Sequence, residues 1–226
     1  AAALPASAIV INRAMGFSAA QFEDEELVSR IAATYRGAGV ERYFLQVTPD
    51  AKSRSLDGQL ARAGLVKARG WQKFRRAPAP ADLPETDFAV EEIGAAHGEA
   101  FARIVCAGFD LGEAAEPWLA CLPGREDWHV FMTFDGDTPA GVGAMYVRDG
   151  VAWTDWGATA PDHRARGSQG LLLAARIDRA RKLGCTSVHT CTGEAVPGDP
   201  QHSWNNIVRH GFAEDYVRTN YAPPKA

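Results

Sequence analysis

The chain has 226 residues and a mass of 24.3 kDa, and its 46% hydrophobic and 23% charged residues are typical of a soluble globular protein. This composition excludes intrinsic disorder, collagen and coiled coil as the main structure, and no apolar run approaches the roughly 20 residues that span a bilayer. The net charge of −4 argues against a general nucleic-acid binder.

The first third of the chain predicts alternating strands and helices. In chain order these are strand, helix, strand, short helix and strand, over 8–11, 22–35, 42–47, 56–63 and 67–76. Acidic residues 23–26 suit the positive end of the longer helix, and Gly64 ends the shorter one.

Prolines then mark a boundary. Pro78, Pro80 and Pro84 fall within seven residues that show no apolar periodicity, which predicts a stiff, extended linker. We therefore expect a first domain over 1–78, a linker over 79–86 and a second domain over 87–226.

The second part predicts more strands, several of them antiparallel. Its elements are a strand at 88–93, helices at 100–107 and 114–121, antiparallel strands at 130–134, 140–147 and 151–158, a loop at 159–170, a helix at 171–183, a strand at 186–192, a helix from Asp199-Pro200 to Gly211 and a strand at 212–221. This order repeats that of the first part at offsets near 145 residues, with Gly39 matching Gly184 and Gly64 matching Gly211.

The loop before the helix at 171–183 carries the strongest chemical signal. Arg164 to Gly170 contains two arginines, two glycines and a serine where a strand ends and a helix begins. Backbone N–H groups at a helix start have no intrahelical acceptor and lie at the positive end of the dipole, so this segment suits a pyrophosphate. It matches neither the P-loop nor the G-x-G-x-x-G fingerprint. The alternative is an ordinary exposed basic loop.

These residues resemble the GNAT superfamily of N-acetyltransferases. Arg164 to Ser168 fit the first five positions of its [QR]-x-x-G-x-[GA] motif, Gln169 replaces the sixth, and Gly170 follows. Asn206-x-x-Arg209-x-Gly211-Phe212 resembles the end of its last helix. The resemblance covers about 86–222, and weakly 8–76 as a degenerate N-terminal GNAT-like copy.

The resemblance implies an α/β fold of the α+β type, with a mainly antiparallel mixed sheet flanked by helices and preceded by a truncated GNAT-like half. It implies acetyl-CoA as cosubstrate, with no metal, and a gap between the strands at 151–158 and 186–192 for the pantetheine arm. The residues expected to bind coenzyme A are Gly157, Ala158, Thr159, Arg164, Ala165, Arg166, Gly167, Ser168, Gln169, Gly170 and Asn206.

Three residues are candidates for handling the amine and its proton. Asp155 is a carboxylate among aromatic residues, so it is a base, an amine anchor or a hydrogen-bonded structural acid. By resemblance Glu194 is the first choice as base, although an exposed loop glutamate is the commoner case. His202 has a side chain suited to proton shuttling or to a structural role. Trp118, Trp128, Trp153 and Trp156 line either an acceptor pocket or the core.

The sequence thus predicts a GNAT-type N-acetyltransferase that transfers an acetyl group from acetyl-CoA to a primary amine of a small molecule or peptide by direct attack. The family often has a Tyr where this chain has Ile207, so a catalytically inactive acyl-CoA-binding protein is the alternative. The four cysteines show no metal-site spacing, and residues 1–12 lack the basic start of a signal peptide. We expect a cytoplasmic protein without nucleic-acid or membrane partners, with a homodimer left open.

Overall fold

The computed structural model describes residues 9 and 11–225, which form two compact units. Of the described residues, those up to 73 together with 193–196 and 216–225 form the first unit, and 74–192 with 197–215 form the second. These units divide the chain at other points than the predicted ranges 1–78, 79–86 and 87–226, because the end of the chain pairs with a strand near its start. The predicted strand at 8–11 falls partly outside the described residues.

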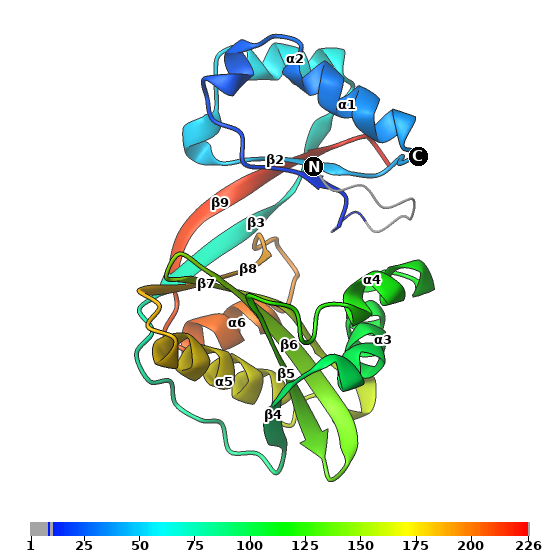
Figure 1. Cartoon of the computed structure of the whole chain (residues 1–226). Helices are drawn as coiled ribbons and strands as arrows, with labels where there is room; N and C mark the ends of the chain where they lie inside the picture. The colour runs from blue at the N-terminus through cyan, green and yellow to red at the C-terminus, as the bar shows by residue number, and fades with distance from the viewer. Residues whose placement is uncertain (1–8, 10, 226) are drawn as a thin grey trace. The chain divides into compact units, whose positions relative to one another are not determined.

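The first unit packs two helices beside short strands (Figure 1). Its elements are β1 (Arg13–Ala14), the 3-10 turn η1 (Gln21–Glu23), α1 (Leu27–Gly37), β2 (Phe44–Val47), the 3-10 turn η2 (Pro49–Ala51), α2 (Leu56–Arg62), most of β3 (Val66–Arg76) and the end of β9 (Ala213–Ala222). β1 is parallel to β2, and β2 is antiparallel to β9 with Leu45 opposite Tyr221. Phe22, Tyr35 and Leu45 are fully buried in its core.

The predicted helix at 22–35 is wrong at its start, because Asp24 interrupts it. Asp24 is extended (φ −73°, ψ 101°), and its carboxylate accepts the N–H of Glu26 at 3.1 Å and pairs with Arg30 at 2.5 Å. A side chain that bonds a neighbouring backbone N–H competes with helical hydrogen bonds. The regular helix therefore begins at Leu27.

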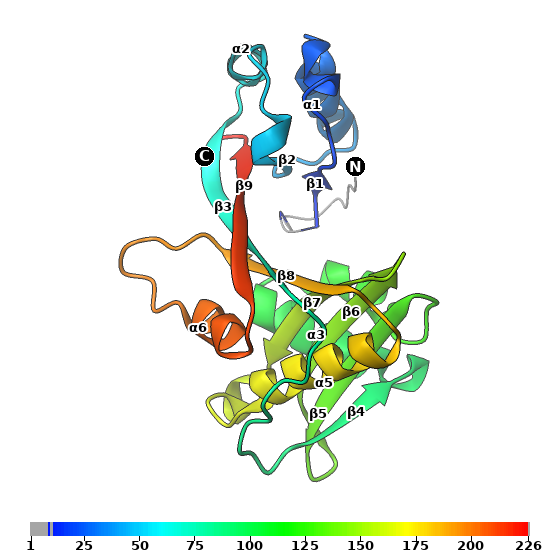
Figure 2. The same ribbon diagram turned by 90° about the vertical axis from the view of Figure 1, so that its left-hand side faces the viewer.

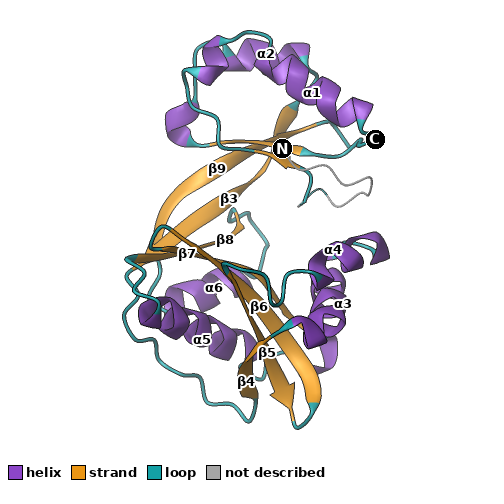
Figure 3. Ribbon diagram, viewed as in Figure 1, coloured by secondary structure: helices purple, strands orange, loops and turns teal. Residues whose placement is uncertain are grey.

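The second unit holds a sheet between two helical layers. Its elements are β4 (Ala89–Ile93), the turn η3 (Ala95–His97), α3 (Gly98–Phe109), the turn η4 (Glu113–Ala115), α4 (Glu116–Ala120), β5 (Trp128–Asp135), β6 (Thr138–Arg148), β7 (Val151–Thr159), the turn η5 (Pro161–His163), α5 (Ser168–Lys182), most of β8 (Ser187–Gly193), α6 (His202–Arg209) and the start of β9. The stretch between β3 and β4 contains no helix or strand (Figure 3).

Strands β4 to β7 form an antiparallel meander, and β8 runs parallel to β7. On one face, Ile177 of α5 packs into a core with Met145, Ala152 and Val188. α3 covers the opposite face (Figures 1 and 2). The mixed, mainly antiparallel sheet flanked by helices confirms the predicted fold class.

Two predicted helix starts are wrong. α5 begins at Ser168 instead of Leu171, so the phosphate-binding candidate Gly170 lies inside its first turn. α6 begins at His202 instead of Asp199, because the Asp199 carboxylate accepts the N–H of Gln201 at 3.0 Å within the preceding loop. No helix among the described residues is long and apolar enough to cross a membrane, and no cluster of His, Cys, Asp and Glu among them could hold a metal ion.

Candidate functional site

A β-bulge interrupts β7 in the middle of the sheet. Val142 pairs with Ala158 and Ala144 pairs with Asp155, so two β7 residues lie opposite one residue of β6. One of the two, Trp156, has φ +52°, a left-handed conformation that is unusual for a bulky residue. Such a conformation costs of order 1–3 kcal/mol and persists only where the surroundings impose it.

A buried arginine on α5 holds the bulge from behind. Arg176 is 4% exposed, and its Nη1 donates to the carbonyls of Ala144 at 3.3 Å and Asp155 at 3.2 Å. Its Nε donates to the carbonyl of Leu172 at 2.9 Å. A Cβ on Gly143 would lie 2.7 Å from Arg176 Cζ, so a larger residue there would displace the guanidinium. Burial lowers the pKa of Arg176 to about 10, which leaves the guanidinium charged at neutral pH.

The carboxylate of Asp155 is bound by two neutral donors. Its Oδ1 accepts the backbone N–H of Trp156 at 2.9 Å, and its Oδ2 accepts the indole N–H of Trp153 at 3.1 Å. No Lys, Arg or His in the described part of the chain forms an ion pair with it. The carboxylate therefore keeps acceptor capacity for a further donor.

Beyond the end of β7, the loop turns twice through left-handed backbone before α5 begins. Ala165 has φ +59° and Gly167 has φ +90°, and Ser168 is the first residue of α5. Gly167 caps the helix without a side-chain hydrogen bond. The N–H groups of the first helical turn lack intrahelical acceptors, and the helix dipole makes this end electropositive. The arrangement suits an anion with several oxygen acceptors.

Three contacts fix the start of α5 against its neighbours. The Ser168 hydroxyl lies 2.8 Å from the Thr133 hydroxyl of β5, and both residues are buried. A Cβ on Gly141 of β6 would overlap the Ser168 hydroxyl. Thr86 donates to the carbonyl of Arg166 at 2.7 Å. The loop is thus held by the sheet and by the segment before β4.

The two arginines of the loop have different surroundings. Arg166 forms an ion pair with Asp135 at 2.6 Å, and its guanidinium lies 4.6 Å from the ring centre of Phe88. The hydrogen bond from Arg166 holds the pKa of Asp135 below its usual range. Arg164 is exposed and donates at 3.4 Å to the carbonyl of Thr159. Arg164 is therefore the arginine whose guanidinium is open to a ligand.

Gln169 joins the phosphate-binding candidates to the end of β7. Its Nε2 donates to the carbonyl of Ala158 at 2.7 Å and to the hydroxyl of Thr159 at 2.9 Å. A Cβ on Gly157 would lie 2.7 Å from Gln169 Oε1. The structure thus brings together the strand residues 157–159 and the loop residues that the sequence assigned to the same ligand.

The sequence predicts a gap between β7 and β8, and the backbone pairing of these two strands covers only the first part of β7. Their backbone pairs among the described residues end at Trp153 and His189. Beyond them, the Thr190 hydroxyl donates to the carbonyl of Thr154 at 3.2 Å, a bond that involves a side chain. The adjoining part of β7 contains the bulge and the residues 157–159.

The last helix of the second unit contains the candidates His202 and Asn206. The His202 side chain is exposed, and the Asn206 carbonyl accepts a hydrogen bond from Nδ1 of His210 at 2.8 Å. His210 is buried, and a Cβ on Gly170 would lie 3.3 Å from its Cε1. The end of α6 therefore lies against the first turn of α5, although the sequence gave no signal for His210.

Glu194 belongs to the first unit. Its backbone N–H donates to the carbonyl of Gly70 at 2.9 Å, and its Oε2 accepts the N–H of Gly70 at 3.0 Å. Arg69 donates to its carbonyl at 2.7 Å. One carboxylate oxygen of Glu194 is thus engaged with β3.

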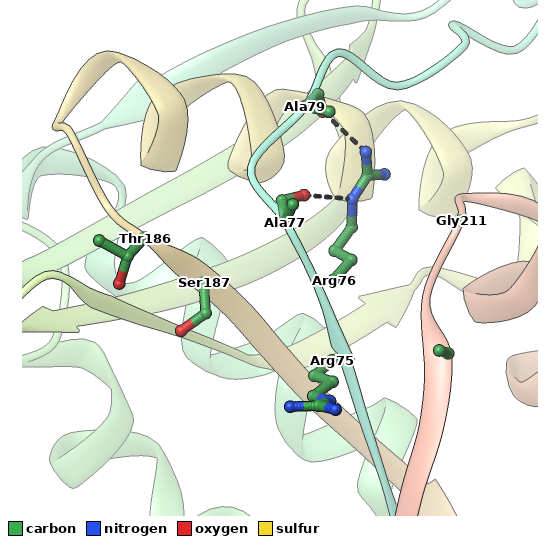
Figure 4. A pocket seen from close by; sticks show the side chains of 8 residues that line it. Arg75, Arg76, Ala77, Ala79, Thr186, Ser187 and Gly211 are labelled. Carbon is green, nitrogen blue, oxygen red and sulfur yellow. Dashed lines mark hydrogen bonds between the residues drawn. The ribbon is translucent and has the colours of Figure 1, made fainter.

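A separate cavity of about 490 Å³ lies between the end of β3 and the start of β8 (Figure 4). The Arg76 guanidinium at its wall donates to the carbonyls of Ala77 at 2.9 Å, Ala79 at 2.7 Å and His210. The Arg76 guanidinium already donates to backbone carbonyls, and none of the predicted site residues lines this cavity. The cavity is therefore not part of the candidate site.

Several residues that shape the site carried no readable signal in the sequence. Arg176 has the pattern of an ordinary helix arginine, and Thr133 and Asp135 lie in a predicted strand and the hairpin turn after it, which look purely structural. Their roles depend on which strands and helices meet, and a single sequence does not specify that. The bulge at Trp156 likewise lies in a run that reads as a regular strand.

Comparisons with known proteins identify the fold. No protein-family model and no curated protein matches the chain. Among solved structures, a GCN5-related N-acetyltransferase from Kribbella flavida superposes with a TM-score of 0.66 at 17% identity, over 93% of this chain and 78% of that one. A second, from Sphaerobacter thermophilus, gives a TM-score of 0.65 at 14% identity, over 89% and 69%.

Further similar structures include a GNAT-family acetyltransferase from Colwellia psychrerythraea, with a TM-score of 0.60 at 16% identity over 89% of this chain and 73% of that one. A region named as a glucosamine N-acetyltransferase within a fungal glycosidase gives 0.62 at 11% identity, over 89% and 28%. At these identities the likeness shows the fold alone. The chain has the fold of the GNAT acetyltransferases.

Proposed function

We propose that the protein is an acyl-CoA-dependent N-acyltransferase that transfers an acetyl group from acetyl-CoA to a primary amine by direct attack. The observation that supports this most is the loop of residues 164–170, where left-handed turns precede the unsatisfied N–H groups of α5. The loop lies beside the end of a bulged central strand, within the fold of the GNAT acetyltransferases.

The residues present fit a diphosphate. Ala165 to Gly170 supply backbone N–H donors at the positive end of a helix, and the exposed guanidinium of Arg164 adds a forked donor. Acetyl-CoA, when bound, would supply the activated acyl thioester, and coenzyme A would leave as the thiol. The role we assign to residues 157–159, with Asn206, is to bind and orient the pantetheine arm, and the role of Arg166 is to hold the loop through Asp135.

The amine must be held in position and must lose a proton to react, and three residues are candidates for these two roles. Asp155 binds and orients the ammonium, because its carboxylate has two neutral donors and no paired cation. Glu194 accepts the proton through the carboxylate oxygen that Gly70 does not bind. His202 is exposed on the first turn of α6 and is the third candidate.

A charge substitution in the loop tests donor binding. Ala165→Asp places a carboxylate beside the proposed diphosphate, while Asn and Asp both tolerate the left-handed backbone at this position. Two like charges about 4 Å apart repel by about 1–4 kcal/mol near a protein surface, so acetyl-CoA should bind about 10-fold weaker or worse in calorimetry. Ala165→Asn is the matched control and should bind like wild type. Equal affinities for all three proteins would contradict the proposal.

The release of free coenzyme A with a panel of primary amines distinguishes the enzyme from a binding protein. Glu194→Gln keeps an oxygen for the Gly70 N–H, so it should leave acetyl-CoA affinity unchanged and lower turnover about 10-fold or more. An unchanged pH–rate profile would exclude Glu194 as the base. The alternative, a catalytically inactive acyl-CoA-binding protein, rests on Ile207, which is buried where the family often has a Tyr. It predicts donor binding without turnover for every amine.

A further inference from the structure

The register of β7 assigns Trp153 and Asp155 to one face of the sheet. Ala152, the residue before Trp153, packs in the core with Ile177 of α5. Side chains alternate along a strand, so Trp153 and Asp155 face away from α5. That side of the sheet is the one α3 covers.

The bulge places the next side chain on the same side. The Trp156 ring lies 5.6 Å from the ring of Phe109 at the end of α3 and 6.0 Å from the ring of Trp118 on α4. Both pairs are close to perpendicular, at 72° and 73°. A regular strand would direct residue 156 to the other face, so the left-handed bulge is what joins Trp156 to the other aromatic rings.

The result is an aromatic–carboxylate cluster, made of Trp118, Trp153, Asp155 and Trp156. Trp128, the fourth candidate from the sequence, lies on the same face of the sheet, but Tyr146 stands between it and Trp153: Trp128 pairs with Tyr146, 5.3 Å away between ring centres, and Tyr146 pairs with Trp153. Trp156 is 5% exposed, whereas Trp118 is 45% exposed. The cluster therefore combines a carboxylate held by two N–H donors with an accessible indole surface.

These two features select for different parts of one ligand. An ionised carboxylate in a partly apolar environment attracts a cation more strongly than one in water, and indole rings add a cation–π attraction. An exposed indole gains from the apolar area it covers, and a body covered with hydroxyl groups offers less of that area than an aryl or alkyl body. The carboxylate is the only charged acceptor in the cluster.

We propose that the acceptor is an amphipathic primary amine, whose ammonium group binds Asp155 and whose aryl or alkyl body packs on Trp118. This inference rests on the proposed function, because it names the class of amine for the same transfer. Trp118 sets specificity, and Asp155 fixes the position of the nitrogen. Amino sugars and other hydroxylated amines are poor acceptors.

Calorimetry with three probes tests the assignment in the absence of acetyl-CoA. Phenethylamine should bind at least 10-fold tighter than 2-phenylethanol, which lacks the charge, and at least 10-fold tighter than glucosamine, which lacks the apolar body. Trp118→Ala and Asp155→Asn should each weaken phenethylamine binding about 10-fold. Trp204→Phe is the matched control, because Trp204 packs 5.0 Å from Phe74 in the core on the α5 side of the sheet, and it should change nothing.

Turnover supplies the second readout. Trp118→Ala should raise KM for phenethylamine with little change in kcat, because Trp118 contacts only the body of the amine. Equal binding of glucosamine and phenethylamine, or an unchanged affinity in Trp118→Ala, would overturn the inference. If acetyl-CoA still binds in those samples, the acceptor assignment alone fails. If wild type does not bind acetyl-CoA, the proposed function fails with it.

Discussion

The buried hydroxyl pair of Thr133 and Ser168 gives a direct test of how the loop is fixed. Thr133 is 0% exposed and Ser168 is 2% exposed, and their oxygens are 2.8 Å apart. Removing one hydroxyl leaves the other buried without a partner, which costs about 1–3 kcal/mol. Removing both leaves no unsatisfied group. Ser168→Ala and Thr133→Val should therefore each lower the free energy of unfolding by about 2 kcal/mol.

The double variant should be much milder than the sum of the two. We expect Thr133→Val/Ser168→Ala to lose at most about 1 kcal/mol, which gives a coupling of at least about 3 kcal/mol in the double-mutant cycle. Urea unfolding followed by tryptophan fluorescence measures all four proteins. Because the pair holds the start of α5 against β5, each single variant should also bind acetyl-CoA more weakly than the double variant.

Ser203→Ala is the matched control, because Ser203 is an exposed serine in the first turn of a helix. It should change the free energy of unfolding by less than about 0.5 kcal/mol. If the effects of the two buried substitutions add within about 0.5 kcal/mol, the hydroxyls do not depend on each other and the reasoning is refuted.

Two further predictions concern packing and pH. Gly143→Ala should lower the free energy of unfolding by about 1–3 kcal/mol, because its Cβ would lie 2.7 Å from the buried guanidinium behind β7. Gly37→Ala, where a Cβ would meet nothing within 4 Å, should be neutral or stabilising in the same urea titration. Because a hydrogen-bonded arginine lowers the pKa of Asp135, that carboxylate contributes stability that is complete above about pH 4 and is lost as the pH falls below it. The difference in urea midpoint between wild type and Asp135→Asn should therefore shrink between about pH 5 and pH 2.

One outcome would contradict each of these two predictions. Equal stability of the Gly143→Ala and Gly37→Ala proteins would show that the guanidinium yields to a methyl group. A difference between wild type and Asp135→Asn that grows as the solution becomes more acidic would show that the carboxylate does not depend on its arginine for stabilisation.

The sequence predicted the elements whose signals are local. The meander of β5 to β7 follows from alternating apolar residues and from the turns around Gly136 and Gly150, both of which have positive φ. The glycines of the loop indicated a helix start that can approach a ligand. The prediction was wrong where an aspartate carboxylate accepts the backbone N–H two residues later, at Asp24 and Asp199, because composition does not reveal which backbone groups a carboxylate binds.

The geometry of the candidate site was only partly predictable. The segment 164–170 and Asp155 could be found from residue types, but the left-handed Ala165 could not, because alanine gives no sign of that conformation. The burial of Arg176 depends on a bulge in a strand that is distant in sequence. The grouping of Trp118, Trp153 and Trp156 around Asp155 depends on the same bulge. These features arise from tertiary packing and required the structure.

The central claim is that backbone N–H groups of residues 165–170 bind the diphosphate of the donor. Hydrogen exchange at these individual amides, measured by NMR with and without saturating coenzyme A, tests it most directly. We predict that exchange slows at several of these amides on binding, while amides of α1 exchange at an unchanged rate. Saturable binding that leaves exchange at residues 165–170 unchanged would contradict the claim.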